Sequence, residues 1–102
     1  MTTQAPKASE LENERVEIIE EMLADHGPNW ADAFKPGSFG CHELLDRTNM
    51  VGDMLEQYVL THPSCAMNPE WYALAEQAVT ALRELYQRIG EKHMMDEKSP
   101  EG

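Results

Sequence analysis

The chain is poor in basic residues and cysteine, and it contains no long apolar run. Eight Lys and Arg residues face nineteen Asp and Glu residues, so the formal net charge over 102 residues is −11. An acidic field of this size repels nucleic-acid phosphates and anionic membrane surfaces, and we expect no direct contact with either. The same field is compatible with a basic protein partner.

Two further absences bear on location. No segment approaches the roughly 20 apolar residues that a membrane-spanning helix needs. The N-terminal stretch MTTQAPKASELENE has no apolar core of the kind found in secretory signal peptides. We therefore expect a cytoplasmic protein.

The chain has only two cysteines, Cys41 and Cys65, whereas a disulfide scaffold normally carries more. If the helix between them is intact, about 20 residues at 1.5 Å each separate them by roughly 30 Å. A disulfide needs Cα atoms within about 7 Å. An intrachain bridge is therefore not expected, while a bridge between two copies through Cys65 stays open.

Apolar residues recur with helical spacing in three segments, and no segment alternates as a β-strand does. The prediction is an all-α fold, a small antiparallel three-helix bundle. In this predicted bundle the helical hairpin 40–61/69–92 packs against the N-terminal helix 9–26. The predicted organisation is a flexible tail at 1–8, a single helical domain at 9–93 and a second flexible tail at 94–102.

Local sequence signals mark the expected start and end of each of these helices. Ser9, followed three residues later by Glu12, matches a capping box, and Gly27 matches a terminating glycine. Ser38 is the expected N-cap of the second helix. Gly90 marks the expected end of the third.

The connector GPNWADAFKPGSFG joins the first two helices and contains Trp30, Phe34 and Phe39. These residues are too apolar for a loose linker. We expect the connector to fold back over one end of the core, with a helical turn around residues 29–34.

The stretch GCHELLDRT, residues 40–48, fits the spacing C-x5-R-[ST] and resembles the phosphate-binding signature of cysteine-dependent phosphatases. That chemistry needs five residues whose backbone N–H groups point at an oxyanion. Here the five are helix formers, two of them carboxylates that repel phosphate, and no strand precedes Cys41. We interpret the stretch as the first turns of an amphipathic helix.

An up-down-up topology brings together the end of the first helix, the start of the second and the end of the third. His26, Cys41 and His93 lie at those ends. A thiolate and two imidazoles suit zinc or another transition metal, with Asp46 or water as fourth ligand. The alternative is that these histidines favour the negative ends of helix dipoles.

The apolar arc of the second helix covers more than half of its circumference, which indicates contact with more than one neighbour. Those neighbours are the other helices or a second copy of the chain. Met50, Met54 and Tyr58 are the expected interface residues, since Met and Tyr suit contact surfaces. On the third helix we predict one core stripe, made of Trp71, Leu74, Ala75, Ala78, Leu82, Leu85, Tyr86 and Ile89.

The first helix is strongly acidic on the side away from its apolar residues. Its carboxylates form either a solubilising face or a docking surface for a basic partner. The proposed docking residues are Glu10, Glu14, Glu17, Glu20 and Glu21.

No Gly-rich phosphate loop and no nucleophile–base pair points to catalysis, so the sequence favours a non-enzymatic protein. The leading hypothesis is an acidic helical protein-interaction module that forms homodimers. Two alternatives stay open: a small zinc-like metal-binding protein, and an acidic, antitoxin-like inhibitor that binds a basic protein.

Overall fold

The computed structural model describes residues 7–97, and this part of the chain is helical, with no strand. The all-α prediction is confirmed. The described residues divide into two compact units, with the boundary between Asp32 and Ala33, and each unit is described by itself. The helices are α1 (Ala8–His26), the 3₁₀-helix η1 (Trp30–Ala33), α2 (Phe39–Met54), the π-helix η2 (Leu55–Leu60), α3 (Pro63–Ala66) and α4 (Pro69–Glu97).

Helix α1 begins one residue earlier than expected, so the prediction of Ser9 as its N-cap is wrong. The backbone N–H of Lys7 donates to Oε1 of Glu10 at 3.0 Å, which makes Lys7 the N-cap. A carboxylate three residues into a helix reaches back to the capping residue in this way. Gly27 ends the helix as predicted, with a φ of 89° that favours glycine and its N–H donating to Leu23.

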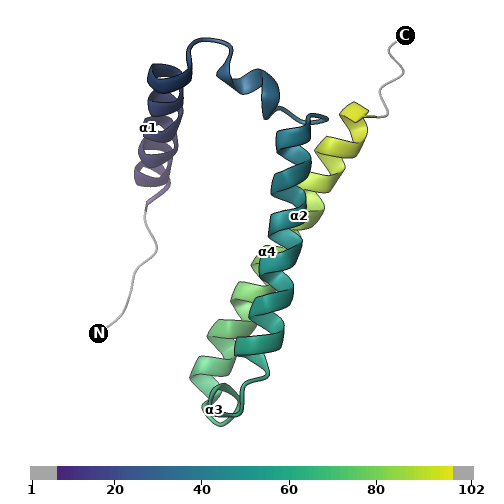
Figure 1. Ribbon diagram of the computed structural model, residues 1–102. Helices are drawn as coiled ribbons and strands as arrows, with labels where there is room; N and C mark the ends of the chain where they lie inside the picture. Colours follow the sequence, from purple (N-terminus) through teal and green to yellow (C-terminus); the bar gives the residue numbers. More distant parts are fainter. Residues whose placement is uncertain (1–6, 98–102) are drawn as a thin grey trace. The chain divides into compact units, whose positions relative to one another are not determined.

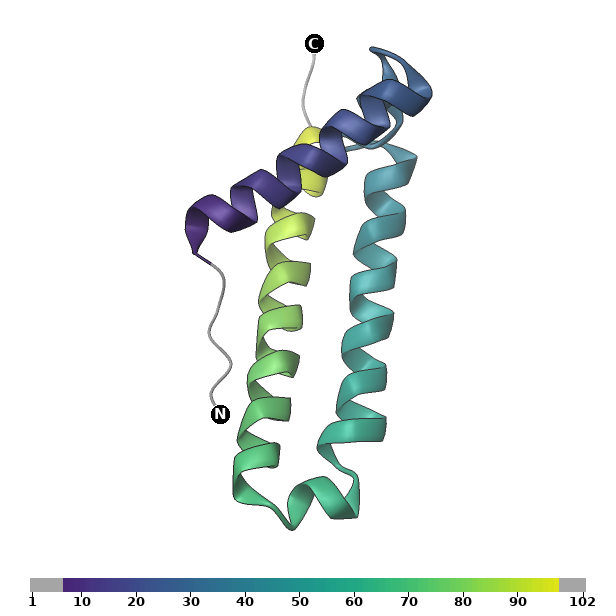
Figure 2. The same ribbon diagram turned by 90° about the vertical axis from the view of Figure 1, so that its left-hand side faces the viewer.

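In the second unit, α2 and α4 run side by side in opposite directions, joined at one end by α3 (Figures 1 and 2). The predicted hairpin is thus confirmed. Ser38 caps α2 as expected, its Oγ accepting from the N–H of Cys41 at 3.2 Å. Oδ1 of Asn68 accepts from the N–H groups of Glu70 and Trp71 and so starts α4. The packing of the N-terminal helix on this hairpin stays a prediction.

Helix α4 is longer than predicted, because Gly90 does not end it. Positive φ angles occur only at Gly27 and Gly37 among the described residues, so Gly90 keeps a right-handed helical backbone. It lies beside Leu45, whose Cδ1 would be 3.7 Å from a Cβ on residue 90. Residues 94–97, assigned to the flexible tail, belong to the helix; residues 1–6 and 98–102 lie outside the described part.

Several of the buried residues in the hairpin have small side chains. Thr48 and Gly52 of α2 are buried, as are Ala75 and Val79 of α4. Oγ1 of Thr48 donates to the carbonyl of Leu44 at 2.8 Å, which satisfies its hydroxyl. Ala75 and Val79 pack with Leu60 and Cys65, and the partly buried Leu55 lies against this cluster.

The six residues that follow α2 form the π-helix η2, at whose end the N–H of Thr61 donates to the carbonyl of Glu56, five residues back. At about 100° per residue, regular α-helical spacing would place Val59 on the same side of the helix as Leu44. The wider turn rotates the chain, so that Leu60 is buried and Val59 is 43 % exposed. The π-helix therefore moves one more apolar side chain to the surface.

Candidate interaction site

Two adjoining grooves lie along one side of the hairpin. The larger, of about 590 Å³, is lined by Tyr58, Val59, His62, Ser64, Cys65, Trp71, Leu74 and Ala75. The smaller, of about 290 Å³, is lined by Val51, Met54, Leu55, Tyr58 and Val59. Because Tyr58 and Val59 line both, the grooves form one continuous surface. We call its large exposed residues the apolar face: Val51, Met54, Tyr58, Val59, Trp71 and Leu74.

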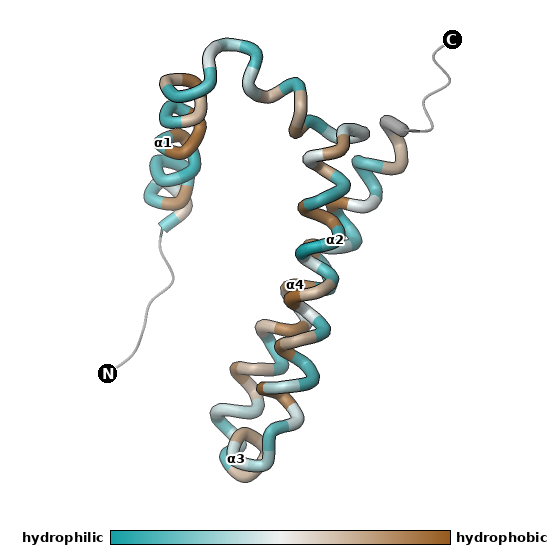
Figure 3. Tube along the Cα trace, viewed as in Figure 1, coloured by the Kyte–Doolittle hydropathy of each residue, from teal (hydrophilic) through white to brown (hydrophobic). Residues whose placement is uncertain are grey.

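The second unit does not itself bury the apolar face. Its six side chains are between 43 % and 62 % exposed. Figure 3 shows apolar residues recurring along both long helices. Single exposed apolar residues are ordinary, but a contiguous patch of this kind is typical of an interaction site. Trp71 and Leu74, which the sequence assigns to the core, are each more than half exposed on the hairpin, so the hairpin itself does not bury them.

Neither groove is lined by an Asp, Glu, Lys or Arg residue. The absence of charge among these lining residues contrasts with the formal net charge of −11 for the whole chain. Such a surface is complementary to another apolar surface, not to a basic one.

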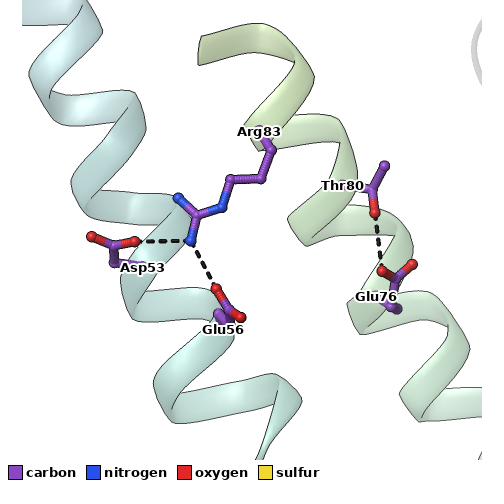
Figure 4. Close-up of polar contacts among 5 residues, drawn as sticks. All are labelled: Asp53, Glu56, Glu76, Thr80 and Arg83. Carbon is purple, nitrogen blue, oxygen red and sulfur yellow. Dashed lines mark hydrogen bonds and ion pairs between the residues drawn. The ribbon is translucent and has the colours of Figure 1, made fainter. Parts of the chain in front are cut away.

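Charged contacts between the two helices lie on another side of the hairpin. Nη2 of Arg83 on α4 is 2.8 Å from Oδ1 of Asp53 and 2.8 Å from Oε1 of Glu56 (Figure 4). The hydrogen bonds that Arg83 donates to Glu56 and Asp53 raise the pKa of Arg83 above its ordinary value. Asp53 follows Val51 by two residues, which corresponds to about 200° of rotation around the helix. The ion pairs therefore lie on a different side of α2 from Val51 and do not cover the apolar face.

The predicted interface residues fall partly on this face. Met54 lines the smaller groove and Tyr58 lines both. Met50 is exposed but lines neither groove. Sequence reasoning missed Val59, because regular periodicity does not foresee a π-helix. It also missed Trp71, because an apolar stripe does not show whether a neighbour covers it.

His93 is the most deeply buried of the predicted metal ligands, at 2 % exposure. Its Nδ1 accepts a hydrogen bond from the N–H of Gly37 at 2.9 Å. A neutral imidazole whose Nδ1 accepts carries its proton on Nε2, so neither nitrogen offers a free lone pair to a metal. In this arrangement Nδ1 of His93 is used by a hydrogen bond, and the assignment of His93 as a metal ligand stays a prediction.

The other members of the predicted metal set lie in different settings. Cys41 is a buried free thiol. Asp46 is exposed, with Oδ2 3.5 Å from Nε2 of His42. His26 belongs to α1 in the other unit. Within residues 7–97 no three His, Cys, Asp or Glu side chains are arranged to hold a metal ion, and metal binding stays a prediction without further support.

The acidic residues of α1 are exposed. Glu10 caps the helix, and Arg15 is paired with Glu12, whose pKa is lowered by that hydrogen bond. The remaining predicted docking residues form no ion pair within the part of the chain that is described: Glu14, Glu17, Glu20 and Glu21.

None of the helices described is both long enough and apolar enough to cross a membrane. Comparison of the chain with protein-family models, curated proteins and solved structures found no match.

Proposed function

We propose that this chain is a non-enzymatic helical interaction module that self-associates, and that the apolar face of one copy packs on the apolar face of another. The continuous, uncharged pair of grooves beside exposed Tyr58, Trp71 and Leu74 carries the proposal. Burial of a large apolar side chain contributes about 1.5–3 kcal/mol, and these side chains are only half buried in one copy. The cytoplasmic location expected from the sequence belongs to the same proposal.

A second copy is the occupant that the charges favour. The basic side chains of a partner could form no ion pair with the lining residues of the grooves, because these residues include no carboxylate. A second copy offers a surface that is equally uncharged and that has both protruding rings and hollows. In a two-fold dimer every residue of the face occurs twice, so each substitution there acts twice.

Sedimentation velocity tests this proposal with two matched variants. Leu74→Glu places a charge in the larger groove and should leave only monomer at a concentration where the unmodified chain is dimeric. Phe39→Glu also replaces an exposed apolar side chain by a carboxylate, but at a residue outside the apolar face, and it should leave the dimer intact. A chain that is monomeric before any substitution, at high micromolar concentration, would refute self-association.

A second candidate function rests on α1. Its unpaired carboxylates suit an acidic docking surface for a basic protein, as in an antitoxin-like inhibitor. Reversal of Glu17, Glu20 and Glu21 to Lys should abolish capture of a basic protein at low salt without unfolding the helices. If capture survives the reversal, this candidate fails.

A further inference from the structure

The composition of the apolar face depends on the helical register of η2. Thr48 and Gly52 of α2 are both buried. Regular α-helical spacing, at about 100° per residue, would place Val59 within about 20° of both. In the structure Leu60 is buried instead, in one cluster with residues of α3 and α4, and Val59 lines both grooves. The π-helical register is therefore what makes Val59 part of the apolar face.

The hydrogen bonds at the end of η2 centre on Thr61. Its N–H donates to the carbonyl of Glu56 at 3.3 Å, and the N–H of His62 donates to the carbonyl of Val59 at 3.1 Å. In a regular α-helix the N–H of Thr61 would donate to the carbonyl of Gln57, four residues back. The hydroxyl of Thr61 donates to this carbonyl instead, with Oγ1 at 2.8 Å from it. The side chain thus replaces the backbone hydrogen bond that the wider turn gives up.

We propose that Thr61 is a positioning residue of the apolar face, because its hydroxyl holds η2 in the register that presents Val59. The inference rests on the proposed function, since it assigns Thr61 to the surface on which two copies pack. Without the hydroxyl, the carbonyl of Gln57 regains an internal partner when the N–H of residue 61 returns to it. That return restores α-helical spacing, turns Val59 to the buried side and removes it from the grooves.

The apolar side chains of the segment fit either register. Val59 and Leu60 are both aliphatic, so each register places an aliphatic side chain in the buried position. Thr61 is exposed, so it acts through its hydroxyl and not through packing. A hydrogen bond of ordinary strength changes such an equilibrium about fivefold. A second copy that packs on Val59 binds the π-helical form, and register and self-association are therefore coupled.

Scalar coupling across hydrogen bonds, measured by NMR, tests the register because it identifies the carbonyl that accepts from a given N–H. In the unmodified chain the N–H of Thr61 should couple to the carbonyl of Glu56. Thr61→Val keeps the shape of the side chain without its hydroxyl, so coupling to Glu56 should weaken and coupling to Gln57 should appear. Thr61→Ser keeps a hydroxyl and should retain the coupling to Glu56. Unchanged coupling in Thr61→Val, or an equal loss in Thr61→Ser, would overturn the proposal.

Sedimentation of the same variants tests the consequence for the apolar face. Thr61→Val should weaken self-association by up to about fivefold, and Thr61→Ser should leave it unchanged. Thr80→Val is the control, because it removes an exposed hydroxyl of α4 that donates to Oε2 of Glu76 at 3.1 Å (Figure 4). It should change neither coupling nor association. A monomeric unmodified chain would refute self-association alone, because the scalar coupling still decides whether Thr61 sets the register.

A measurement on the unmodified chain keeps the test decisive if Thr61→Val does not fold. A hydroxyl held on the carbonyl of Gln57 requires one χ1 rotamer of Thr61. Three-bond couplings of this side chain should therefore report a single rotamer that directs Oγ1 towards Gln57. Couplings averaged over several rotamers would overturn the proposal.

Discussion

Arg83 on α4 and Asp53 on α2 are tied together by a contact of 2.8 Å between Nη2 and Oδ1, across a sequence separation of 30 residues. The same nitrogen lies 2.8 Å from Oε1 of Glu56. This tie secures the polar side of the hairpin and leaves its apolar face free.

Replacement of Arg83 by Met should destabilise the hairpin modestly. Met keeps the apolar stem but removes both ion pairs, which are exposed to solvent and therefore weak. We expect the thermal midpoint to fall by about 2–4 °C, and by less in high salt because salt screens exposed charges. Calorimetry at two salt concentrations measures both effects. An equal loss at both would indicate that packing, not charge, explains the change.

Replacement of Gly90 by Ala should stabilise the protein. Gly90 lies inside α4, where glycine is less favourable than alanine by about 0.5–1 kcal/mol. A Cβ at this position would make an ordinary contact of 3.7 Å with Leu45. Urea denaturation should show the midpoint moving upward. A lower midpoint would mean that the two helices approach more closely here than the structure shows.

Gly40 is predicted to respond in the opposite way. It also lies in a helix, so propensity alone predicts that Gly40→Ala stabilises the chain. However, a Cβ there would run into the carbonyl of Ala33 and the ring of Phe34. We expect a loss of about 1–3 kcal/mol from this overpacking. The same urea series as for Gly90 provides the comparison, and a gain in stability would show that the connector does not lie against α2.

The π-helix predicts contrasting effects at two neighbouring residues. Leu60 is buried, so Leu60→Ala should cost about 2–5 kcal/mol. Val59 is nearly half exposed, and Val59→Ala should cost well under half as much while weakening self-association. Chemical denaturation of both variants decides between registers, because regular α-helical spacing predicts the reverse order.

Self-association should strengthen with salt. Two copies that each carry a formal charge of −11 repel one another, and their contact surface is uncharged. Screening lowers that repulsion, whereas it would weaken the docking of a basic partner. Sedimentation at 50 mM and 500 mM NaCl measures the direction. Weaker association at the higher concentration would indicate that charged contacts hold the copies together.

The features that depend on neighbouring residues could be predicted from the sequence. Ser38 starts α2 and Gly27 ends α1 as expected, because a helix cap involves only the adjacent turn. Ser9 was misjudged because Glu10 offers the same carboxylate chemistry to an earlier residue. Gly90 was misjudged because a glycine can also continue a helix with a right-handed backbone, as it does here.

Features that depend on distant residues could not be predicted. The partner of His93 is the N–H of Gly37, 56 residues away, and a backbone group leaves no signal in side-chain chemistry. Hydropathy placed Trp71 and Leu74 in an apolar stripe correctly. Whether the stripe is covered depends on which other elements pack on it, and hydropathy along one helix does not show this.

Two methionines allow the most direct test of the apolar face. Met54 lines its smaller groove, whereas Met50, one turn earlier on α2, lines neither groove and is equally exposed. The chain should be labelled at its methionine methyl groups and followed by NMR over a dilution series from millimolar to low micromolar concentration. Self-association through the apolar face predicts that the Met54 signal shifts on dilution while the Met50 signal stays in place. A Met54 signal that does not change with concentration, or that changes no more than that of Met50, would contradict it.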